Sequence, residues 1–285
     1  MKTTMTNTYE TSVDSNFCSC KGWRYQRKPV QFRSCKHLVA AGVSKPVTSY
    51  IWKPKLPKPK IMLYSENRRL IQDNWMCSEK LDGVRGFWNG QVMVTRNGFI
   101  IDIPKRIRDS LSTLHVDGEF WGEKHLLGDI VNAIQSKAGS GNWKDINFYV
   151  FDVHNKDIFI DRYNKVKEYP FFCKQSYINK RDVPTTLESI CMNGGEGLII
   201  RNPTGEYKNY GRSKDVTKVK PIMFGEAVFD VIQSLFIETE TGINFKMKYN
   251  KDKAIPNLMK VKFQYTGRTT KNKPKYPKII SYSID

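Results

Sequence analysis

The sequence lacks any long hydrophobic run. No segment approaches the ~18 uninterrupted apolar residues that a membrane-spanning helix requires. The first residues, MKTTMTNTYETSVDSNF, also lack the basic and apolar regions of a secretory signal. We therefore expect an intracellular protein, in the cytoplasm, the nucleus or a viral factory, that is not secreted, has no membrane partner and keeps its thiols reduced.

Acidic residues are scarce relative to basic residues. The chain has 28 Asp and Glu against 47 Lys and Arg, a formal net charge of +19 at pH 7, and the excess is spread along the sequence. Such a chain is suited to a polyanion, because each phosphate that it neutralises releases counterions. An anionic membrane surface is the alternative polyanion, but the lysine-rich stretches have no strongly apolar helical face beside them. The composition favours nucleic acid.

Proline and lysine mark the organisation of the chain. With 285 residues, it is long enough for a catalytic domain and one or two small modules. The stretch WKPKLPKPK is typical of an extended, solvated linker, and β-rich patterns dominate after Pro221. We predict four parts: a small module at 1–50, a linker at 51–60, a catalytic domain at 61–221 and an all-β module at 222–285.

The predicted catalytic domain mixes two periodicities. Short β-type runs such as VRGFWNG, HVDGEFWG, NFYVFDV and GEGLIIRNP alternate with helical patterns around RIRDSLSTL and HLLGDIVNAIQ. This mixture predicts antiparallel sheets with helices packed on them, an α+β fold.

A lysine in the segment SEKLDGVRGFW is a candidate nucleophile. Lys80 precedes the turn-forming pair Asp82-Gly83, and Arg85 follows. A lysine that attacks phosphorus must first lose its proton, so we expect a cationic or desolvating environment that lowers the pKa of Lys80. Taken alone, however, K-x-D-G is an ordinary turn with a solvated lysine.

Further motifs downstream supply the other groups that nucleotidyl transfer needs. These are two carboxylates suited to a divalent cation, an aromatic ring suited to a base, and paired cations suited to phosphates. Each also has an ordinary explanation: strand-end acids, a core phenylalanine and a solvated edge strand. The candidates are Glu119 in VDGEFW, Phe151 in FYVFDV, Glu196 in GGEGLIIR, and Lys218 and Lys220 in KVKP.

The order and spacing of these motifs resemble the covalent nucleotidyltransferase superfamily of DNA ligases, RNA ligases and messenger-RNA capping enzymes. Lys80 to Arg85 is similar to the K-x-D-G-x-R nucleophile motif, and TRNG, which contains Arg96, is similar to the ligase element that follows it. Arg212, in KNYGRS, stands where small viral-type DNA ligases carry a phosphate-binding arginine. The resemblance covers about residues 60–285.

The resemblance implies an activity and a role for each residue. Lys80 would attack the α-phosphate of ATP to form lysyl-AMP, and the AMP would then activate the 5′-phosphate of nicked duplex DNA, in replication or repair. Glu119 and Glu196 would hold Mg²⁺ or Mn²⁺. The implied nucleotide-binding residues are Arg85, Arg96, Glu119, Phe151, Arg212, Lys218 and Lys220. The implied fold is an antiparallel-sheet nucleotidyltransferase domain, ATP-grasp-like, followed by a small OB-fold β-barrel.

The end of the chain distinguishes among members of the superfamily. It is similar to the Y-x-G-x-T-x-x-G-x-P-x-x-P close of the OB-fold domain in minimal DNA ligases, with Asn272 in place of one glycine, and asparagine also accepts a left-handed turn. A capping guanylyltransferase, an RNA ligase and a non-catalytic nucleic-acid-binding protein remain alternatives, but TRNG and GEGLIIRNP favour a DNA ligase. The residues that would orient pyrophosphate are not identified, and the nearest candidate is Lys251-Asp252-Lys253.

The first module carries the pattern C-x-C…C-x-H. Thiolates and imidazole are the ligands of structural Zn²⁺, and a basic segment this short needs such support to fold. We predict a zinc site at Cys18, Cys20, Cys35 and His37, and the pattern resembles the SWIM zinc finger. Cys77, Cys173 and Cys191 are expected to be unpaired.

Between the two ligand pairs, KGWRYQRKPVQFR alternates aromatic residues with cations. Rings that can stack beside cations that can contact phosphate favour a nucleic-acid face. A protein-docking module is the alternative. We expect the chain to act as a monomer.

Overall fold

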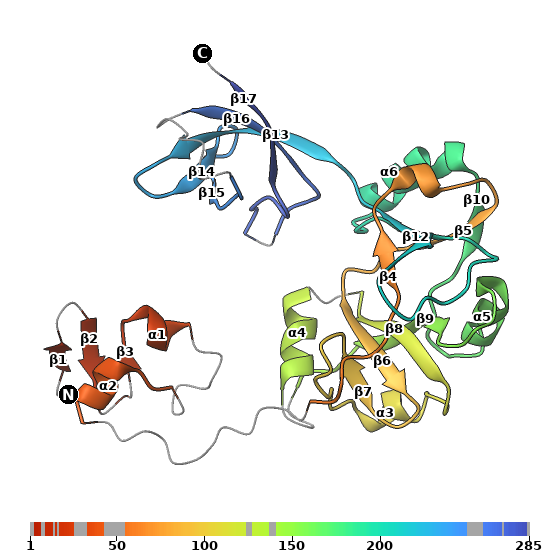
Figure 1. The fold of residues 1–285 in the computed structure, drawn as a ribbon, viewed down its shortest axis with the longest axis horizontal. Helices are drawn as coiled ribbons and strands as arrows, with labels where there is room; N and C mark the ends of the chain where they lie inside the picture. Colours follow the sequence, from red (N-terminus) through yellow and green to blue (C-terminus); the bar gives the residue numbers. More distant parts are fainter. Residues whose placement is uncertain are drawn as a thin grey trace. The chain divides into compact units, whose positions relative to one another are not determined.

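The computed structural model describes residues 3–6, 9–13, 15, 17–25, 33–42, 55–123, 127–136, 141–249, 259–269 and 271–283. The chain divides into two compact units, Met1–Lys55 and Leu56–Asp285, and each is described by itself. Figure 1 shows the elements of both units along the chain. The candidate linker residues 51–54, Phe32 and the segment 251–253 lie outside the described residues.

Among its described residues, the first unit has a small sheet and two one-turn helices (Figure 1). Its antiparallel strands follow the order β1-β2-β3, with bounds β1 Thr3–Thr6, β2 Tyr9–Ser12 and β3 Phe17–Cys18; the helices are α1 Lys21–Arg24 and α2 Lys36–Ala40. The buried core consists of Cys18, Cys20, Trp23 and Leu38. Two of those four side chains are thiols, so hydrophobic burial alone gives this unit little stability.

The second unit contains three sheets, and among its described residues the elements have the following bounds. The strands are β4 Leu63–Ser65, β5 Trp75–Glu79, β6 Val84–Asn89, β7 Met93–Thr95, β8 His115–Trp121, β9 Asn147–Val153, β10 Ser176–Ile178, β11 Leu198–Arg201, β12 Arg212–Val219, β13 Met223–Asp230, β14 Leu235–Glu238, β15 Asn244–Phe245, β16 Lys260–Tyr265 and β17 Lys278–Ser283. The helices are η2 Arg68–Leu70, α3 Lys105–Arg108, α4 Leu127–Gln135, α5 Phe159–Val166, η3 Lys180–Asp182 and α6 Val183–Met192.

The first of these sheets is antiparallel, in the order β7-β6-β8-β9. Buried apolar residues of β6, β8 and β9 form a core with the buried faces of α3, α4 and α5. Sheets with helices packed on them confirm the predicted α+β mixture, including the helices expected near RIRDSLSTL and HLLGDIVNAIQ.

The second sheet has the order β10-β5-β11-β12-β4, antiparallel except for the parallel pair β12 and β4. Helix α6 packs on it through Val183 and Leu187. Gly197, just before β11, has φ +150° and lies so close to β12 that a Cβ atom there would be 2.2 Å from the carbonyl oxygen of Val219. The GEG turn therefore requires glycine at this position, which lets β11 approach both of its neighbours.

The third sheet, β15-β14-β13-β16-β17, is antiparallel and has its own aromatic core, which includes Phe229, Phe236 and Phe263. Figure 1 shows these strands together at the blue end of the chain. Asn272 has φ +56°, the left-handed conformation expected where it replaces glycine.

The unit boundary falls inside the predicted linker. Leu56 donates a backbone hydrogen bond to Gly98 (2.9 Å), so residues 56–60 belong to the second unit although most of their side chains are exposed. Proline and lysine content indicated exposure and an extended backbone, but not this backbone pairing. None of the helices in the described ranges is long and apolar enough to cross a membrane.

Candidate functional site

A cleft in the second unit collects side chains from the first two sheets. Its walls come from β4, β5, β8, β9, β11 and the segments that follow β5 and α5. The residues that line it are Tyr64, Ser78, Glu79, Lys80, Leu81, Glu119, Phe151, Cys173, Ile199 and Arg201. The structure therefore brings Lys80, Glu119 and Phe151 of the predicted site to one cavity.

Lys80 lies at the end of β5, where its backbone N–H donates to the carbonyl of Gly197 (2.8 Å). Its Nζ forms an ion pair with one carboxylate oxygen of Glu196 and donates to the carbonyl of Leu81 (3.3 Å). The other carboxylate oxygen of Glu196 pairs with Lys220. Glu196, with 12% of its side chain exposed, thus bridges two lysines that are 22% and 18% exposed.

The carboxylates around Lys80 determine the protonation of its amine. Burial alone would lower its pKa, but Glu196, together with Glu119 and Asp82, outweighs burial and raises the pKa above its usual value. The expectation of a lowered pKa is therefore wrong for the protein without nucleotide. The groups nearest the amine are anions, and the cation Lys220 is itself neutralised by Glu196.

Glu119, in the middle of β8, is a carboxylate in the cleft wall. Burial raises its pKa to about 7, and the positive charges of Lys80 and Arg85 oppose that rise only in part. At neutral pH this group exists in both protonation states, so it can accept a hydrogen bond or bind a cation when ionised and donate when protonated.

Two aromatic rings form the apolar part of the cleft. Phe151, in β9, is 7% exposed, and its ring centroid lies 6.3 Å from that of Tyr64. The aliphatic side chains of Leu81 and Ile199 also line the cavity. An aromatic, apolar wall beside charged groups has the character of a nucleotide site, with base and phosphate regions.

Arg85, a predicted nucleotide contact, lies outside the cleft lining. It makes a bidentate ion pair with the buried Asp117 (3.0 and 2.7 Å) and donates to the carbonyl of Met62 (2.9 Å). Its guanidinium contacts the ring of Phe151, with 5.4 Å between its carbon and the ring centroid. Arg85 therefore supports the wall from outside rather than pointing a donor into the cavity.

The other predicted cations also lie outside the cleft lining. Lys218, in β12, pairs with Glu66 (2.7 Å), and Arg212 donates to the carbonyl of Tyr64 (2.6 Å). Arg96 is exposed in the turn after β7. Of the predicted phosphate contacts, Lys220 is the one that shares a carboxylate with Lys80.

Tyr64 and Arg201 line the cleft but are not among the residues predicted from the motifs. Tyr64 is the middle residue of the short strand β4, where nothing in the local pattern distinguishes it. Arg201 ends the apolar strand β11, and a charged residue in the otherwise buried run LIIR was the available signal, because a buried charge needs a reason.

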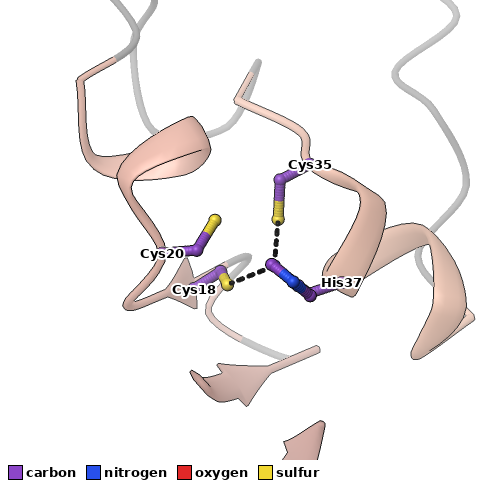
Figure 2. Close-up of side chains that lie close together, drawn as sticks. All are labelled: Cys18, Cys20, Cys35 and His37. Carbon is purple, nitrogen blue, oxygen red and sulfur yellow. Dashed lines mark hydrogen bonds between the residues drawn. The ribbon is translucent and has the colours of Figure 1, made fainter. Parts of the chain in front are cut away.

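The first unit holds a second candidate site, the Cys/His cluster in Figure 2. The ligand atoms of Cys18, Cys20, Cys35 and His37 all lie within 4.8 Å of one another. His37 Nδ1 is 3.7 Å from the sulfur of Cys18 and 3.9 Å from that of Cys35. Tetrahedral zinc with ordinary bond lengths separates its ligand atoms by about 3.5–3.8 Å, so the cluster fits such an ion.

The remaining cysteines differ in exposure: Cys77 is buried, and Cys173 and Cys191 are half-buried. Burial raises the pKa of Cys77 and of Cys173 to about 12, and it also raises the pKa of Cys191. They are free and in their neutral form at physiological pH, as expected.

Comparison with known proteins finds a relative by sequence. No family model matches the chain. A DNA ligase of Haemophilus influenzae is 31% identical over 170 residues, a match that covers 56% of this chain and 62% of that protein. The chain thus spans less than two thirds of the length of the curated relative that it matches.

Solved structures share the fold. A Lig E DNA ligase superimposes with a TM-score of 0.70 at 23% identity, covering 78% of this chain and 98% of the other. Chlorella virus DNA ligase-adenylate gives a TM-score of 0.51 at 21% identity, with 80% of this chain and 99% of the other covered. The second unit therefore has the antiparallel-sheet nucleotidyltransferase fold of solved DNA ligases.

Proposed function

We propose that this chain is an ATP-dependent DNA ligase that seals nicks through a covalent lysyl-AMP intermediate. The observation that carries the proposal is the cleft itself, in which the amine of Lys80 stands beside Glu119 and an aromatic wall, with Glu196 and Lys220 at the amine. The sequence similarity to the Haemophilus influenzae DNA ligase supports the choice of DNA as the substrate.

The cleft can hold a nucleoside in one orientation. Phe151 and Tyr64 offer aromatic surface for the adenine base, and Glu119, in the same lining, would hydrogen-bond a ribose hydroxyl. The α-phosphate would then face Lys80 and Lys220, because their ammonium groups are the positive charges beside the base-binding wall. Lys218 and Arg212, currently paired with Glu66 and the Tyr64 carbonyl, would supply further positive charge.

The first chemical step is attack of Lys80 Nζ on the α-phosphorus of ATP. A nitrogen–phosphorus bond forms as the bond to pyrophosphate breaks, and the amine loses its proton. Lys80 must leave its ion pair with Glu196 for this to happen, since that pair holds the proton on the amine. Lys220 then faces the negative charge that develops on the phosphate oxygens.

Glu119 and Glu196 are suited to bind Mg²⁺ or Mn²⁺ together with phosphate oxygens. Mg²⁺ is commonly held by one or two carboxylates, substrate phosphates and water, and the cleft offers two carboxylates next to the reacting amine. The bound cation would supply charge stabilisation at the phosphate. Glu196, once drawn to such a cation, would release Lys80 from its anionic partner.

The later steps use the same groups. The AMP passes from Lys80 to the 5′-phosphate of the nick, and the adjacent 3′-hydroxyl displaces AMP to close the strand. The fixed cations would stabilise the transition state of each phosphoryl transfer, because negative charge accumulates on the phosphate oxygens in every step.

The finer organisation is also part of the proposal. The third sheet of the second unit fits a small OB-fold domain, which we place at 222–285 after the nucleotidyltransferase domain at 61–221. Cys18, Cys20, Cys35 and His37 would bind structural Zn²⁺ in a SWIM-type module, because their ligand atoms are spaced for it. The protein would act inside the cell on nicked duplex DNA, as a monomer.

Covalent labelling with different nucleotides tests this proposal. The zinc-loaded full chain is incubated with Mg²⁺ and with ATP, GTP or NAD⁺, each labelled in the phosphate that would remain on the enzyme, and then denatured. Label from ATP alone is the expected result. Label from GTP would instead indicate a capping guanylyltransferase, and a chain that takes no label but binds DNA would be a non-catalytic binding protein.

A further inference from the structure

Arg201 is the most deeply buried charge in the wall of the cleft. It ends β11 and is 1% exposed, yet it lines the cavity in which the proposed function places the nucleotide. Burying a guanidinium costs several kcal/mol, so such a residue persists only when its contacts serve stability or function.

Its hydrogen bonds are few for such a buried group. Nη2 donates to the hydroxyl of Tyr64 (3.1 Å), and Nη1 lies 3.5 Å from a carboxylate oxygen of Asp152. The buried Nε–H has no partner in the structure as described. An arginine that merely stabilised the core would be expected to use all of its donors.

The guanidinium also contacts the rings of the cleft wall. Its central carbon is 5.1 Å from the ring centroid of Tyr64 and 5.2 Å from that of Phe151, both of which line the cavity. Arg201 thus holds the two rings from behind, one of them by a hydrogen bond as well. Cation–ring contacts of this kind strengthen when desolvated.

The neighbouring buried arginines differ from Arg201. Arg85 forms an ion pair with Asp117 through two hydrogen bonds. Arg162 forms one with Asp152, with 2.7 Å between its Nε and a carboxylate oxygen. Asp152 is thus closer to Arg162 than to Arg201. Arg201 is therefore the buried cation of this group with the weakest neutralisation, and it is also the one that lines the cleft.

We propose that Arg201 is a positioning residue for the nucleotide base. It holds the rings of Tyr64 and Phe151, which meet edge to face, in the part of the cleft wall where the base would bind. Arg201 therefore acts on the base and not on the triphosphate. The inference rests on the proposed function, because it assumes that the cleft binds ATP.

Two ligands separate the base from the phosphates. Binding is measured for an ATP analogue with an uncleavable α–β bridge and for inorganic tripolyphosphate, in Mg²⁺, by calorimetry. Arg201→Lys keeps the charge but loses the planar fork, and we expect the analogue to bind roughly ten-fold more weakly. Tripolyphosphate binding should change by less than about two-fold, since it does not use the wall.

A milder variant covers the case in which Arg201→Lys does not fold. Tyr64→Phe removes one hydroxyl, and we expect about a three-fold loss for the analogue and none for tripolyphosphate. In the double variant the two losses should not add, because each breaks the same hydrogen bond. Arg162→Lys is the matched control: it changes a buried arginine on the same Asp152 but outside the cleft lining, and it should leave the ratio of the two affinities unchanged.

The outcomes are distinct. Equal losses for both ligands in Arg201→Lys and Tyr64→Phe would make the role purely structural and overturn the proposal, as would unchanged affinities. A wild-type chain that binds neither the analogue nor ATP would refute the nucleotide site itself and, with it, the role of Arg201.

Discussion

Replacing Glu196 by glutamine tests how the unliganded protein holds its nucleophile. The variant keeps the shape of the side chain but removes the negative charge that Lys80 and Lys220 share. Breaking a fully buried pair costs about 3–5 kcal/mol and an exposed one about 0–1 kcal/mol. Since these side chains are 12–22% exposed, we expect a loss of about 2–3 kcal/mol in the free energy of unfolding.

The same variant should change Lys80 in two opposite ways. Burial, now less opposed by anions, should lower the pKa of the Lys80 amine relative to the wild type, so a small acylating reagent should modify it faster near neutral pH. Adenylylation should nevertheless slow by ~10²-fold or more, since Glu196 is proposed to place the metal and the reacting phosphate. Faster acylation of Lys80 together with slower adenylylation would show that Glu196 has two separate effects: it holds the proton on the amine, and it positions the phosphate.

The assay combines peptide mass spectrometry of Lys80 acylation across pH with single-turnover adenylylation at saturating Mg²⁺. Glu66→Gln is the matched control, because Glu66 pairs with Lys218 at 2.7 Å but is 66% exposed. Its loss should cost less than about 1 kcal/mol and leave the acylation profile of Lys80 unchanged. If Glu196→Gln left that profile unchanged or moved it to higher pH, the stated cause of the raised pKa would be wrong.

Three further predictions concern the zinc cluster, the first unit and Glu119. Cys35→Ser should lose one equivalent of bound zinc and unfold the first unit, while lysyl-AMP formation by the second unit continues. Deletion of residues 1–50 should spare lysyl-AMP formation but weaken binding to nicked DNA, and the slope of log K against log salt should become shallower by ~0.9 for each lost phosphate contact. In Mg²⁺-free buffer, the stability advantage of the wild type over Glu119→Gln should fall as pH rises from about 4.5 to about 7, by up to about 3 kcal/mol.

The sign of the pH effect follows from the raised pKa of Glu119. The folded state holds this proton up to about pH 7, while the unfolded state releases it near pH 4.5. The protonated carboxyl therefore favours folding at low pH, and this contribution to stability is lost as the pH rises from about 4.5 to about 7. A rising advantage over that interval in thermal melts would contradict the direction. Equal zinc content in Cys35→Ser, measured by elemental analysis, would remove Cys35 from the ligand set. An unchanged nick affinity and salt slope after truncation would favour a protein partner for the first unit.

Local patterns predicted much of the second unit. Strands β6, β8 and β9 fall within the β-type runs VRGFWNG, HVDGEFWG and NFYVFDV, whose branched and aromatic residues favour strands. The parallel pairing of β4 with β12 joins residues almost 150 positions apart, and nothing in the short segment LYS indicates it. Such pairings depend on tertiary packing and not on propensity.

The site was predictable in its motifs but not in its electrostatics. Motif order placed Lys80 and Glu119 in one group, and the structure brings them to one cleft. The direction of the Lys80 pKa shift was missed because it depends on carboxylates that only the fold brings to the amine, above all Glu196. Arg85 was predicted to contact the nucleotide, whereas in the fold it pairs with Asp117 of the neighbouring strand.

A pulse–chase experiment follows the AMP from Lys80 to the nick. The chain is labelled with α-³²P-ATP and Mg²⁺, freed of nucleotide, and mixed with nicked duplex DNA without ATP, and the labelled peptide is identified in a parallel sample. If Lys80 is the nucleophile, one AMP is found on Lys80, moves to the 5′-phosphate of the nick and is displaced as the strand closes. Lys80→Arg should take no label, because arginine stays protonated. Label on another residue, or nick sealing by Lys80→Arg, would contradict it.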